Sequence, residues 1–211
     1  MIPDLNRVFE LGIEENLVLD GAFLGMWEQL SDWQFRALRE LGLKPSDKVL
    51  DVGCVPMRLG AELVPYLDDG NYYGIDAFEP YIRLASKLLP MAAPGKTAHL
   101  LADHDFTFSR FGARFRFAIA QSVITHLSVA ETETCIANLV EVMEPGGQFV
   151  FTYILSRRTS GRLYGGRYPM RTGRFESSSL FDDLARRHGL TFRILDSDHP
   201  TGQSVGVMTF G

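Results

Sequence analysis

Residues 48–60 constrain the fold more than any other part of the sequence. An apolar run at 49–52, interrupted only by Asp51, indicates a buried strand of a parallel sheet. The run breaks at Gly53, and residues 57–67 then carry apolar side chains at helical spacing. Strand, glycine turn and helix in this order are typical of the cofactor-binding half of an α/β fold, in which the turn and the helix N-terminus face the ligand.

The glycines of this turn decide between classes of cofactor. The dinucleotide fingerprint needs glycine at the first, third and sixth places of the turn. Gly53 fits the first place, but Val55 and Arg58 hold the other two, which argues against NAD or FAD. The alternative interpretation is an ordinary strand, turn and helix with an aspartate at the strand end, and this stretch alone does not separate the two.

The remaining apolar patterns predict an α/β fold with a mainly parallel sheet, because strands and helices alternate. Gly42 is a stop signal for N-terminal helices, and a break between two helices is expected at 21–25. Strands are expected at 49–52, 72–76, 97–101, 115–120, 148–153, 191–195 and 205–210. Helices are expected within 1–44 and at 57–67, 81–89, 127–143 and 177–187.

Composition excludes several classes of protein. The 211 residues suffice for one substantial domain, and the net charge of -5 argues against a general binder of nucleic acid or anionic membranes. Cys54 and Cys135 are too few for a secreted disulfide scaffold, no apolar run approaches the ~20 residues of a membrane span, and no signal-peptide core opens the chain. We therefore expect a cytoplasmic protein. The five histidines lack metal-ligand spacing, so no metal site is predicted.

Acidic residues follow the second and third predicted strands. Asp76 ends the second strand 23 positions after Gly53, close to the spacing of about 20 at which a ribose-binding acid is expected. A carboxylate accepts hydrogen bonds from both ribose hydroxyls, and the competing role is to cap the next helix. Asp103 follows the third strand, where it either contacts a ligand or caps the segment after it.

The order Val-Leu-Asp-Val-Gly-Cys at 49–54, the Asp76 spacing and the Pro-Gly-Gly of 145–147, predicted to be a turn before the fifth strand, together resemble the class I S-adenosylmethionine-dependent methyltransferases. The resemblance implies a Rossmann-like, mainly parallel seven-stranded sheet with helices on both faces and an inserted antiparallel last strand. It also implies a helical N-terminal addition, residues 1–44, before a cofactor domain at 45–211. With S-adenosylmethionine as cofactor, the resemblance assigns these contacts: Asp51, Gly53, Cys54, Asp76, Ala77, Asp103, His104, Gln121 and Ser122.

The sequence departs from this family in the turn, where Val55 and Met57 stand at places that are usually glycine. Positive φ at a valine would cost about 1–3 kcal/mol. We therefore predict a negative φ at Val55, with Pro56 fixing the next residue, so that Gly53 and Cys54 alone would hold the methionine end of the cofactor. A positive φ at Val55 would instead favour a non-catalytic binding module.

Candidate acceptor residues come from other segments. His126 lies after the fourth strand, where it is either a general base or a residue that packs the next helix. Trp27 and Tyr153 are candidate substrate contacts, although Trp27 also fits plain helix packing. The loop at 157–175 is predicted to be a lid that selects an anionic acceptor through Arg162 and Arg167, or else a solvated basic loop. Its arginines are Arg157, Arg158, Arg162, Arg167, Arg171 and Arg174.

These observations favour methyl transfer to an O, N or C nucleophile of a small molecule, in specialised metabolism. Two alternatives stay open: an enzyme that uses the same cofactor for cyclisation or rearrangement, and a degenerate module that binds without catalysis. RNA modification would rest on the arginine-rich loop alone, and the acidic composition opposes it. The sequence predicts a small-molecule partner, no nucleic acid and no membrane.

Overall fold

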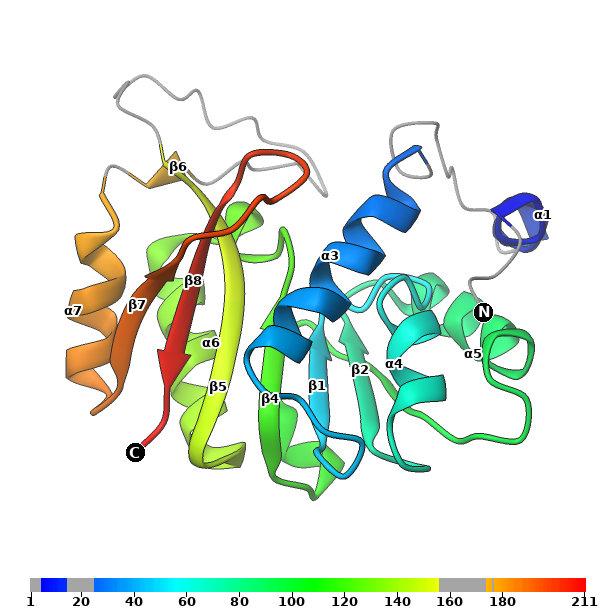
Figure 1. The fold of residues 1–211 in the computed structure, drawn as a ribbon, viewed down its shortest axis with the longest axis horizontal. Helices are drawn as coiled ribbons and strands as arrows, with labels where there is room; N and C mark the ends of the chain where they lie inside the picture. The colour runs from blue at the N-terminus through cyan, green and yellow to red at the C-terminus, as the bar shows by residue number, and fades with distance from the viewer. Residues whose placement is uncertain (1–4, 15–24, 156–173, 176) are drawn as a thin grey trace. The chain divides into compact units, whose positions relative to one another are not determined.

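The computed structural model describes residues 5–14, 25–155, 174–175 and 177–211 (Figure 1). The chain forms two compact units, Met1–Asp105 and Phe106–Gly211. Unit 1 contains the predicted cofactor turn, and unit 2 contains the predicted general base. Each unit has its own strands and helices.

Unit 1 is built on three parallel strands, β1 (Val49–Val52), β2 (Tyr72–Asp76) and β3 (His99–Ala102). β2 pairs with both neighbours, so the strand order is β1-β2-β3. All four residues of β1 are buried, including Asp51. The continuous apolar run therefore marks a strand that is buried, as predicted from the sequence.

Four helices of unit 1 are described: α1 (Leu5–Glu14), α3 (Trp27–Glu40), α4 (Gly60–Tyr66) and α5 (Glu79–Ala92). α5 contacts β2 and β3, α4 contacts β2, and α3 packs on α4. The buried face of α3 repeats at helical spacing and includes Trp27, Leu30, Trp33, Ala37 and Leu38.

α4 begins at Gly60, three residues later than the sequence predicted. The reason lies in the backbone, because Met57 has a φ of 66° and an α-helix needs a negative φ. Gly60 itself has no room for a side chain, since a Cβ there would lie 2.8 Å from Sδ of Met57. The apolar residues at 57–59 belong to the turn that precedes the helix.

Unit 2 holds the strands β4 (Phe115–Ala120), β5 (Met143–Leu155), β6 (Arg174–Phe175), β7 (Thr191–Leu195) and β8 (Ser204–Thr209). β4 and β5 are parallel, and β8 lies antiparallel between β5 and β7. Figure 1 shows β8 in red beside β5. The expected inserted antiparallel strand is confirmed, and the short pairing of β6 with β5 was not predicted.

The Pro-Gly-Gly segment is a bulge inside β5 rather than a turn before it. β5 begins at Met143, which pairs with Phe115, but the next paired residue of β4, Phe117, faces Gln148. Residues 144–147 therefore loop out of register. Gly146 has a φ of 72°, which glycine adopts without strain.

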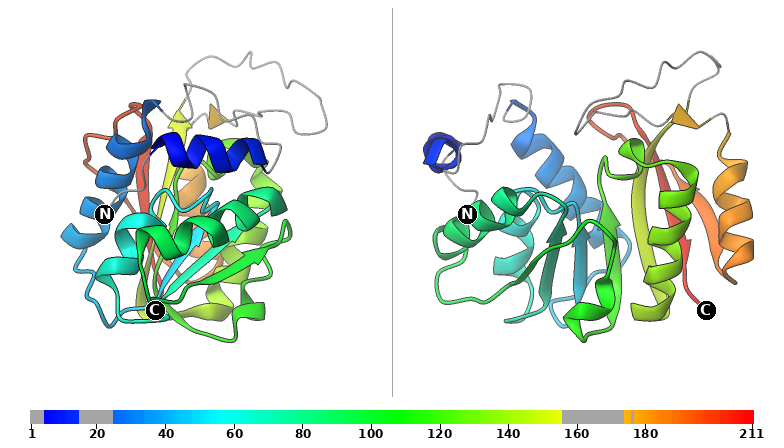
Figure 2. Two further views of the ribbon diagram at one scale, coloured as in Figure 1. Left: turned by 90° about the vertical axis from the view of Figure 1, so that its right-hand side faces the viewer. Right: turned by 180° about the vertical axis from the view of Figure 1, so that it is seen from behind.

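The helical elements of unit 2 are η1 (Phe108–Phe111), η2 (Ile124–His126), α6 (Val129–Val142) and α7 (Ser179–Arg187). Seen from behind, α6 lies in front of β5 and β8 (Figure 2). α7 packs on β7 through Phe181, whose ring lies 4.9 Å from the ring of Phe151 in β5. Within the described parts of the chain, no helix is long and apolar enough to span a bilayer.

α6 starts with a capping box. Oγ of Ser128 accepts a hydrogen bond from the amide of Glu131 at 3.2 Å, and the Glu131 carboxylate accepts one from the amide of Ser128 at 2.7 Å. Both bonds satisfy amides that the first helical turn would leave without an intrahelical acceptor.

Replacing Ser128 by alanine should lower the free energy of unfolding by about 1 kcal/mol, because one helix-end amide loses its acceptor. Urea unfolding followed by circular dichroism measures the change. Thr134→Ala is the matched control, since this exposed hydroxyl on the same helix donates only to the carbonyl of Ala130. An equal loss in both variants would contradict the capping role.

Candidate functional site

The carboxyl ends of three neighbouring parallel strands bring acidic side chains to one edge of unit 1. Asp51 lies in β1, Asp76 ends β2 and Asp103 follows β3. Backbone bonds join neighbouring ends, because the Gly53 amide donates to the Ile75 carbonyl at 2.8 Å and the Asp103 amide donates to the Asp76 carbonyl at 3.0 Å. The same edge carries the turn of residues 53–57, so the sequence-predicted acids of unit 1 are indeed neighbours. This is the edge at which open α/β sheets bind ligands.

The 53–57 turn follows a path that is usual for glycine. Its φ angles are 71° at Gly53, 39° at Val55 and 66° at Met57. The prediction of a negative φ at Val55 is therefore wrong. A valine with positive φ is a rare, strained conformation. The substitutions at 55 and 57 have thus kept the glycine-type path instead of reshaping the turn.

Internal hydrogen bonds occupy the amides of this turn. The amides of Gly53 and Cys54 both donate to the carbonyl of Ile75, at 2.8 and 3.0 Å. The amide of Val55 donates to Oδ2 of Asp76 at 3.1 Å. Since these amide protons point at β2, Gly53 and Cys54 can contact a ligand only through their carbonyl oxygens. That they hold a ligand stays a prediction.

The side chains of the turn face inward. Cys54 is 1% exposed, and its Sγ lies 3.0 Å from where a Cβ of Gly74 would stand. Burial raises the pKa of the Cys54 thiol well above its ordinary value, which supports packing rather than nucleophilic chemistry. Met57 is fully buried against Gly60.

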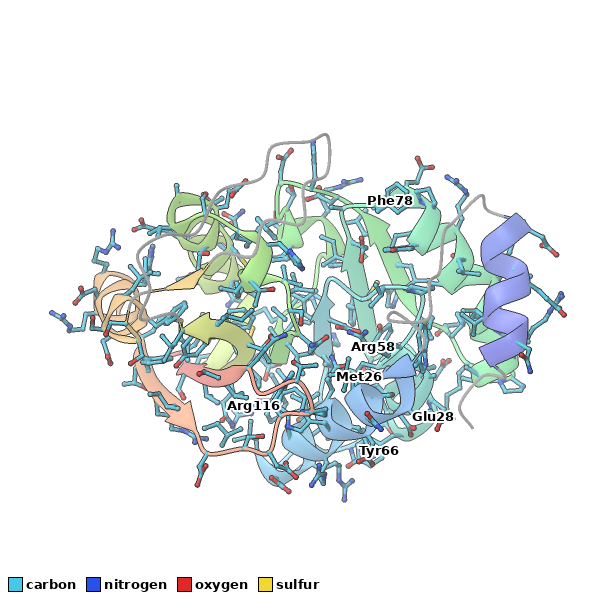
Figure 3. All side chains as sticks on the ribbon, turned by 90° about the horizontal axis from the view of Figure 1, so that it is seen from above. Met26, Glu28, Arg58, Tyr66, Phe78 and Arg116 are labelled. Atoms are coloured by element: carbon cyan, nitrogen blue, oxygen red, sulfur yellow. The ribbon has the colours of Figure 1, made fainter. Side chains whose placement is uncertain are left out.

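Asp76 is oriented by two backbone amides. Its Oδ1 accepts from Phe78 at 2.9 Å, and its Oδ2 accepts from Val55 at 3.1 Å. Burial raises the pKa of Asp76, and these two amide bonds oppose the rise. Phe78, labelled in Figure 3, is the N-cap residue of α5 and no side chain caps this helix, so Asp76 bonds to the residue before the helix and is not the predicted helix cap. Each oxygen keeps a second lone pair that can accept from a ligand. Ala77, between them, is exposed.

Asp51 is buried beside two residues that the sequence analysis missed. Its Oδ2 accepts a hydrogen bond from the hydroxyl of Tyr72 at 2.7 Å. Burial raises its pKa to about 7, against the lowering effects of Tyr72 and the nearby Arg58 guanidinium. Tyr72 is two positions before Gly74, the partner of Asp51 in the neighbouring strand, so strand alternation puts both side chains on one face. That register was the signal that could have found Tyr72.

Arg58 connects the turn to α3. It is 8% exposed, and its carbonyl accepts a hydrogen bond from Oγ of Ser31 at 2.7 Å. Figure 3 shows Arg58 beside α3. On the same helix, Trp27 is fully buried, as the packing interpretation expected.

The end of β3 has the geometry of a local cap. Oδ1 of Asp103 accepts from the amide of Asp105 at 2.9 Å, which matches the capping alternative. His104 is exposed, with Nδ1 3.3 Å from the Asp105 carboxylate. A ligand contact of Asp103 or His104 stays a prediction.

In unit 2, Ser122 follows β4 with a φ of 59° and lies at the centre of a polar network. Its Oγ accepts from Nε2 of Gln121 at 2.7 Å and from Nε2 of Gln203 at 2.8 Å. Its amide donates to Oγ1 of Thr152 at 2.7 Å, and its carbonyl accepts from Thr125 at 2.6 Å. Sequence reasoning found Gln121 and Ser122 but missed Gln203, which is 81 positions away.

The other predicted residues of unit 2 differ in exposure. His126 ends η2 and is exposed, and its role as a general base stays a prediction. Tyr153 is fully buried, with its ring 4.6 Å from that of Phe181, and burial raises its pKa. Arg162 and Arg167 lie outside the described residues. Among the residues that are described, no cluster of histidine, cysteine and carboxylate side chains could hold a metal.

The raised pKa of Asp51 predicts a pH dependence. Between about pH 4 and pH 7 the folded protein keeps a proton that the unfolded chain releases, so stability falls as the pH rises through this range. From pH 5 to pH 8, the free energy of unfolding should fall by about 2–3 kcal/mol more in the wild type than in Asp51→Asn, whose amide cannot ionise. Urea unfolding at both pH values measures this, with the exposed Asp68→Asn as control. Parallel pH profiles for wild type and Asp51→Asn would contradict the assignment.

Comparisons with known proteins agree with this geometry. Residues 49–147 match the model of a family described as a methyltransferase domain. The magnesium protoporphyrin IX methyltransferase of Synechocystis PCC 6803, solved with bound S-adenosylmethionine, is 14% identical over 100% of this chain and 86% of its own, with a TM-score of 0.65. DesVI of Streptomyces venezuelae is 16% identical over the whole of both chains, with a TM-score of 0.66.

A third similar structure is CalS10, an amino pentose methyltransferase of calicheamicin biosynthesis from Micromonospora echinaspora, also solved with bound S-adenosylmethionine. It is 16% identical over 97% of each chain, with a TM-score of 0.65. The match begins at β1 and includes the turn and all three acids of unit 1. Residues 49–147 are therefore similar to a methyltransferase domain, and the chain shares its fold with methyltransferases solved with bound S-adenosylmethionine.

Proposed function

We propose that the enzyme methylates an O, N or C nucleophile of a small molecule, in specialised metabolism. The observation that carries the proposal is the acidic edge of unit 1, where Asp51, Asp76 and Asp103 lie in or after three neighbouring strands and Asp76 bonds to the 53–57 turn. Similar structures also support a small acceptor, because their names specify a porphyrin and an amino pentose.

The chemistry of this edge fits the cofactor. S-adenosylmethionine carries a positive sulfonium and an ammonium group, which call for acceptors and negative charge. The turn offers acceptors at the carbonyls of Gly53 and Cys54, whose amide protons are bonded to β2, whereas the carbonyls of Val55 and Met57 accept from the amides of Met57 and Ala61. We assign the ribose hydroxyls to Asp76 and the adenine amino group to Asp103, with Gln121 and Ser122 as further contacts.

The acceptor side of the proposal rests on His126 and on the arginine-rich loop. His126 is exposed, and an imidazole can accept a proton from an O or N nucleophile. We propose that Arg162 and Arg167 select an anionic acceptor, since arginine binds carboxylate and phosphate through two parallel hydrogen bonds. This part of the proposal is supported by the sequence alone, because both residues lie outside the described chain.

The positive φ of Val55 favours a second candidate, a degenerate interaction module that neither uses the cofactor nor catalyses, because a branched side chain occupies a turn position that is usually glycine. Calorimetric titration with S-adenosylmethionine and S-adenosylhomocysteine separates the two candidates. Binding of both, together with release of S-adenosylhomocysteine in the presence of an acceptor, supports the methyltransferase. Absence of binding supports the non-catalytic module. Consumption of S-adenosylmethionine without transfer to an acceptor would indicate a cyclase or a related enzyme.

Asp76→Ala should weaken S-adenosylmethionine binding by about 1.5–3 kcal/mol, the range for a hydrogen bond to a charged group. Isothermal titration of the folded variant measures the loss. Asp68→Ala is a matched control, because this exposed aspartate lies before β2 on the same unit and should leave the affinity unchanged. Wild-type affinity in a folded Asp76→Ala would rule out the ribose contact.

His126→Asn should reduce the rate of methyl transfer by about 10²-fold or more, because asparagine cannot accept the proton. The assay follows S-adenosylhomocysteine release with a panel of phenol, carboxylate and amino-sugar acceptors. A matched His99→Asn variant, at the exposed first residue of β3, controls for loss of a histidine outside the predicted site. If His126→Asn keeps more than about a tenth of the wild-type rate on the acceptor that reacts, His126 is not the base.

A further inference from the structure

We propose that Asp76 also positions the cofactor turn, by holding Val55 in its strained backbone conformation. The inference rests on the proposed function only in naming the turn's ligand, because the holding contact itself lies within unit 1. It adds to the ribose contact a second task for the same carboxylate, performed through a different hydrogen bond.

The strain is located at Val55. With a φ of 39°, its branched side chain crowds the backbone, and a residue in such a region costs about 1–3 kcal/mol. Such residues persist only where the surrounding structure over-determines them. Relaxation to a negative φ would rotate the peptide plane before Val55 and carry its amide away from β2.

The end of β2 accepts hydrogen bonds from three consecutive amides of the turn. The Ile75 carbonyl accepts from Gly53 and Cys54, and Oδ2 of Asp76 accepts from Val55. The first two bonds hold Gly53 and Cys54, which do not carry the strain of Val55. The bond from Val55 to Asp76 is the one that resists rotation at the strained position.

The Asp76 carboxylate is itself held in place. Oδ1 accepts from the Phe78 amide at 2.9 Å, so the side chain cannot turn to follow Val55 without losing this second bond. On the other side of the strain, Met57 donates its amide to the Val55 carbonyl at 2.6 Å, and its side chain is fully buried. Val55 is therefore fixed at its amide by Asp76 and at its carbonyl by a buried neighbour.

This arrangement has a consequence for cofactor binding. A turn already held in the glycine-type path needs no rearrangement when the ligand arrives. The strain therefore lowers the stability of the folded protein and does not weaken ligand binding. If Asp76 is removed, Val55 can relax, and the turn must then be strained again during binding. Loss of Asp76 should therefore weaken binding twice, through the ribose and through the turn.

A double-mutant cycle between Asp76 and Val55 tests the inference without any ligand. Glycine adopts positive φ without strain, so after Val55→Gly the turn no longer needs the hydrogen bond to Asp76 to keep its path. Asp76→Ala should lower the folding equilibrium constant about ten-fold with Val55 in place, and less than about three-fold in the Val55→Gly background. Urea unfolding measures both, with Asp68→Ala in the two backgrounds as control. Equal losses in the two backgrounds would overturn the proposal.

Asp76→Asn keeps one acceptor oxygen and replaces Asp76→Ala in the same cycle, with the same criterion, if the alanine variant does not fold. Amide hydrogen exchange at Val55 gives a local readout. It should speed up at least ten-fold more than exchange at Gly53 when Asp76 is replaced, since the Gly53 amide donates to Ile75. Equal acceleration of exchange at both amides would mean a general loss of stability of unit 1 and would overturn the proposal that Asp76 holds Val55.

Titration with S-adenosylhomocysteine distinguishes this proposal from the proposed function. In the Asp76→Ala background, Val55→Gly should raise the affinity for S-adenosylhomocysteine about three-fold or more. The loss of affinity that then remains relative to the wild type measures the ribose contact. No restoration would show that the strained turn does not affect binding and would overturn the positioning role. If the wild type does not bind S-adenosylhomocysteine at all, the proposed function fails, while the unfolding cycle still decides whether Asp76 holds Val55.

Discussion

The hydrogen bonds from the 53–57 turn to the end of β2 are the interaction on which the cofactor half of this protein depends. Ile75 and Asp76 together accept the amides of Gly53, Cys54 and Val55. Parallel pairing of β1 with β2 places these acceptors beside the turn, because Val52 is paired with Ile75. The first strand cannot present its turn unless the second strand is already in register.

This dependence explains how the turn tolerates a valine where glycine is usual. The strain at Val55 is a local cost of about 1–3 kcal/mol, and one hydrogen bond to a charged acceptor contributes a comparable amount. The carboxylate of Asp76 therefore balances the strain that the side chain of Val55 introduces. The sequence analysis treated the two residues separately, Asp76 as a ribose ligand and Val55 as a φ angle, and its prediction for Val55 was wrong for that reason.

The fold was largely predictable from the sequence, and two of the exceptions share one physical cause. Apolar runs and helical spacing located the strands of both units, since burial leaves a periodic signal along the chain. They misplaced the start of α4 at 57, and placed a turn at 145–147 that is a bulge inside β5. In both cases a positive φ, at Met57 and at Gly146, decides the local structure, and hydrophobic periodicity does not report φ.

The site was predictable where it follows strand ends and unpredictable where it depends on register. Asp51 and Asp76 could be placed from their positions along the sequence alone. Tyr72 and Gln203 could not, because Tyr72 bonds to Asp51 from the neighbouring strand and Gln203 bonds to Ser122 from 81 positions away. In unit 2 the same arrangement recurs, because Ser122 has a positive φ and is held by hydrogen bonds with Gln121, Thr125, Thr152 and Gln203. Each unit thus fixes a strained residue after its first strand through partners that sequence spacing does not reveal. Strain of this kind is retained at functional sites because a pre-organised backbone removes a rearrangement from ligand binding.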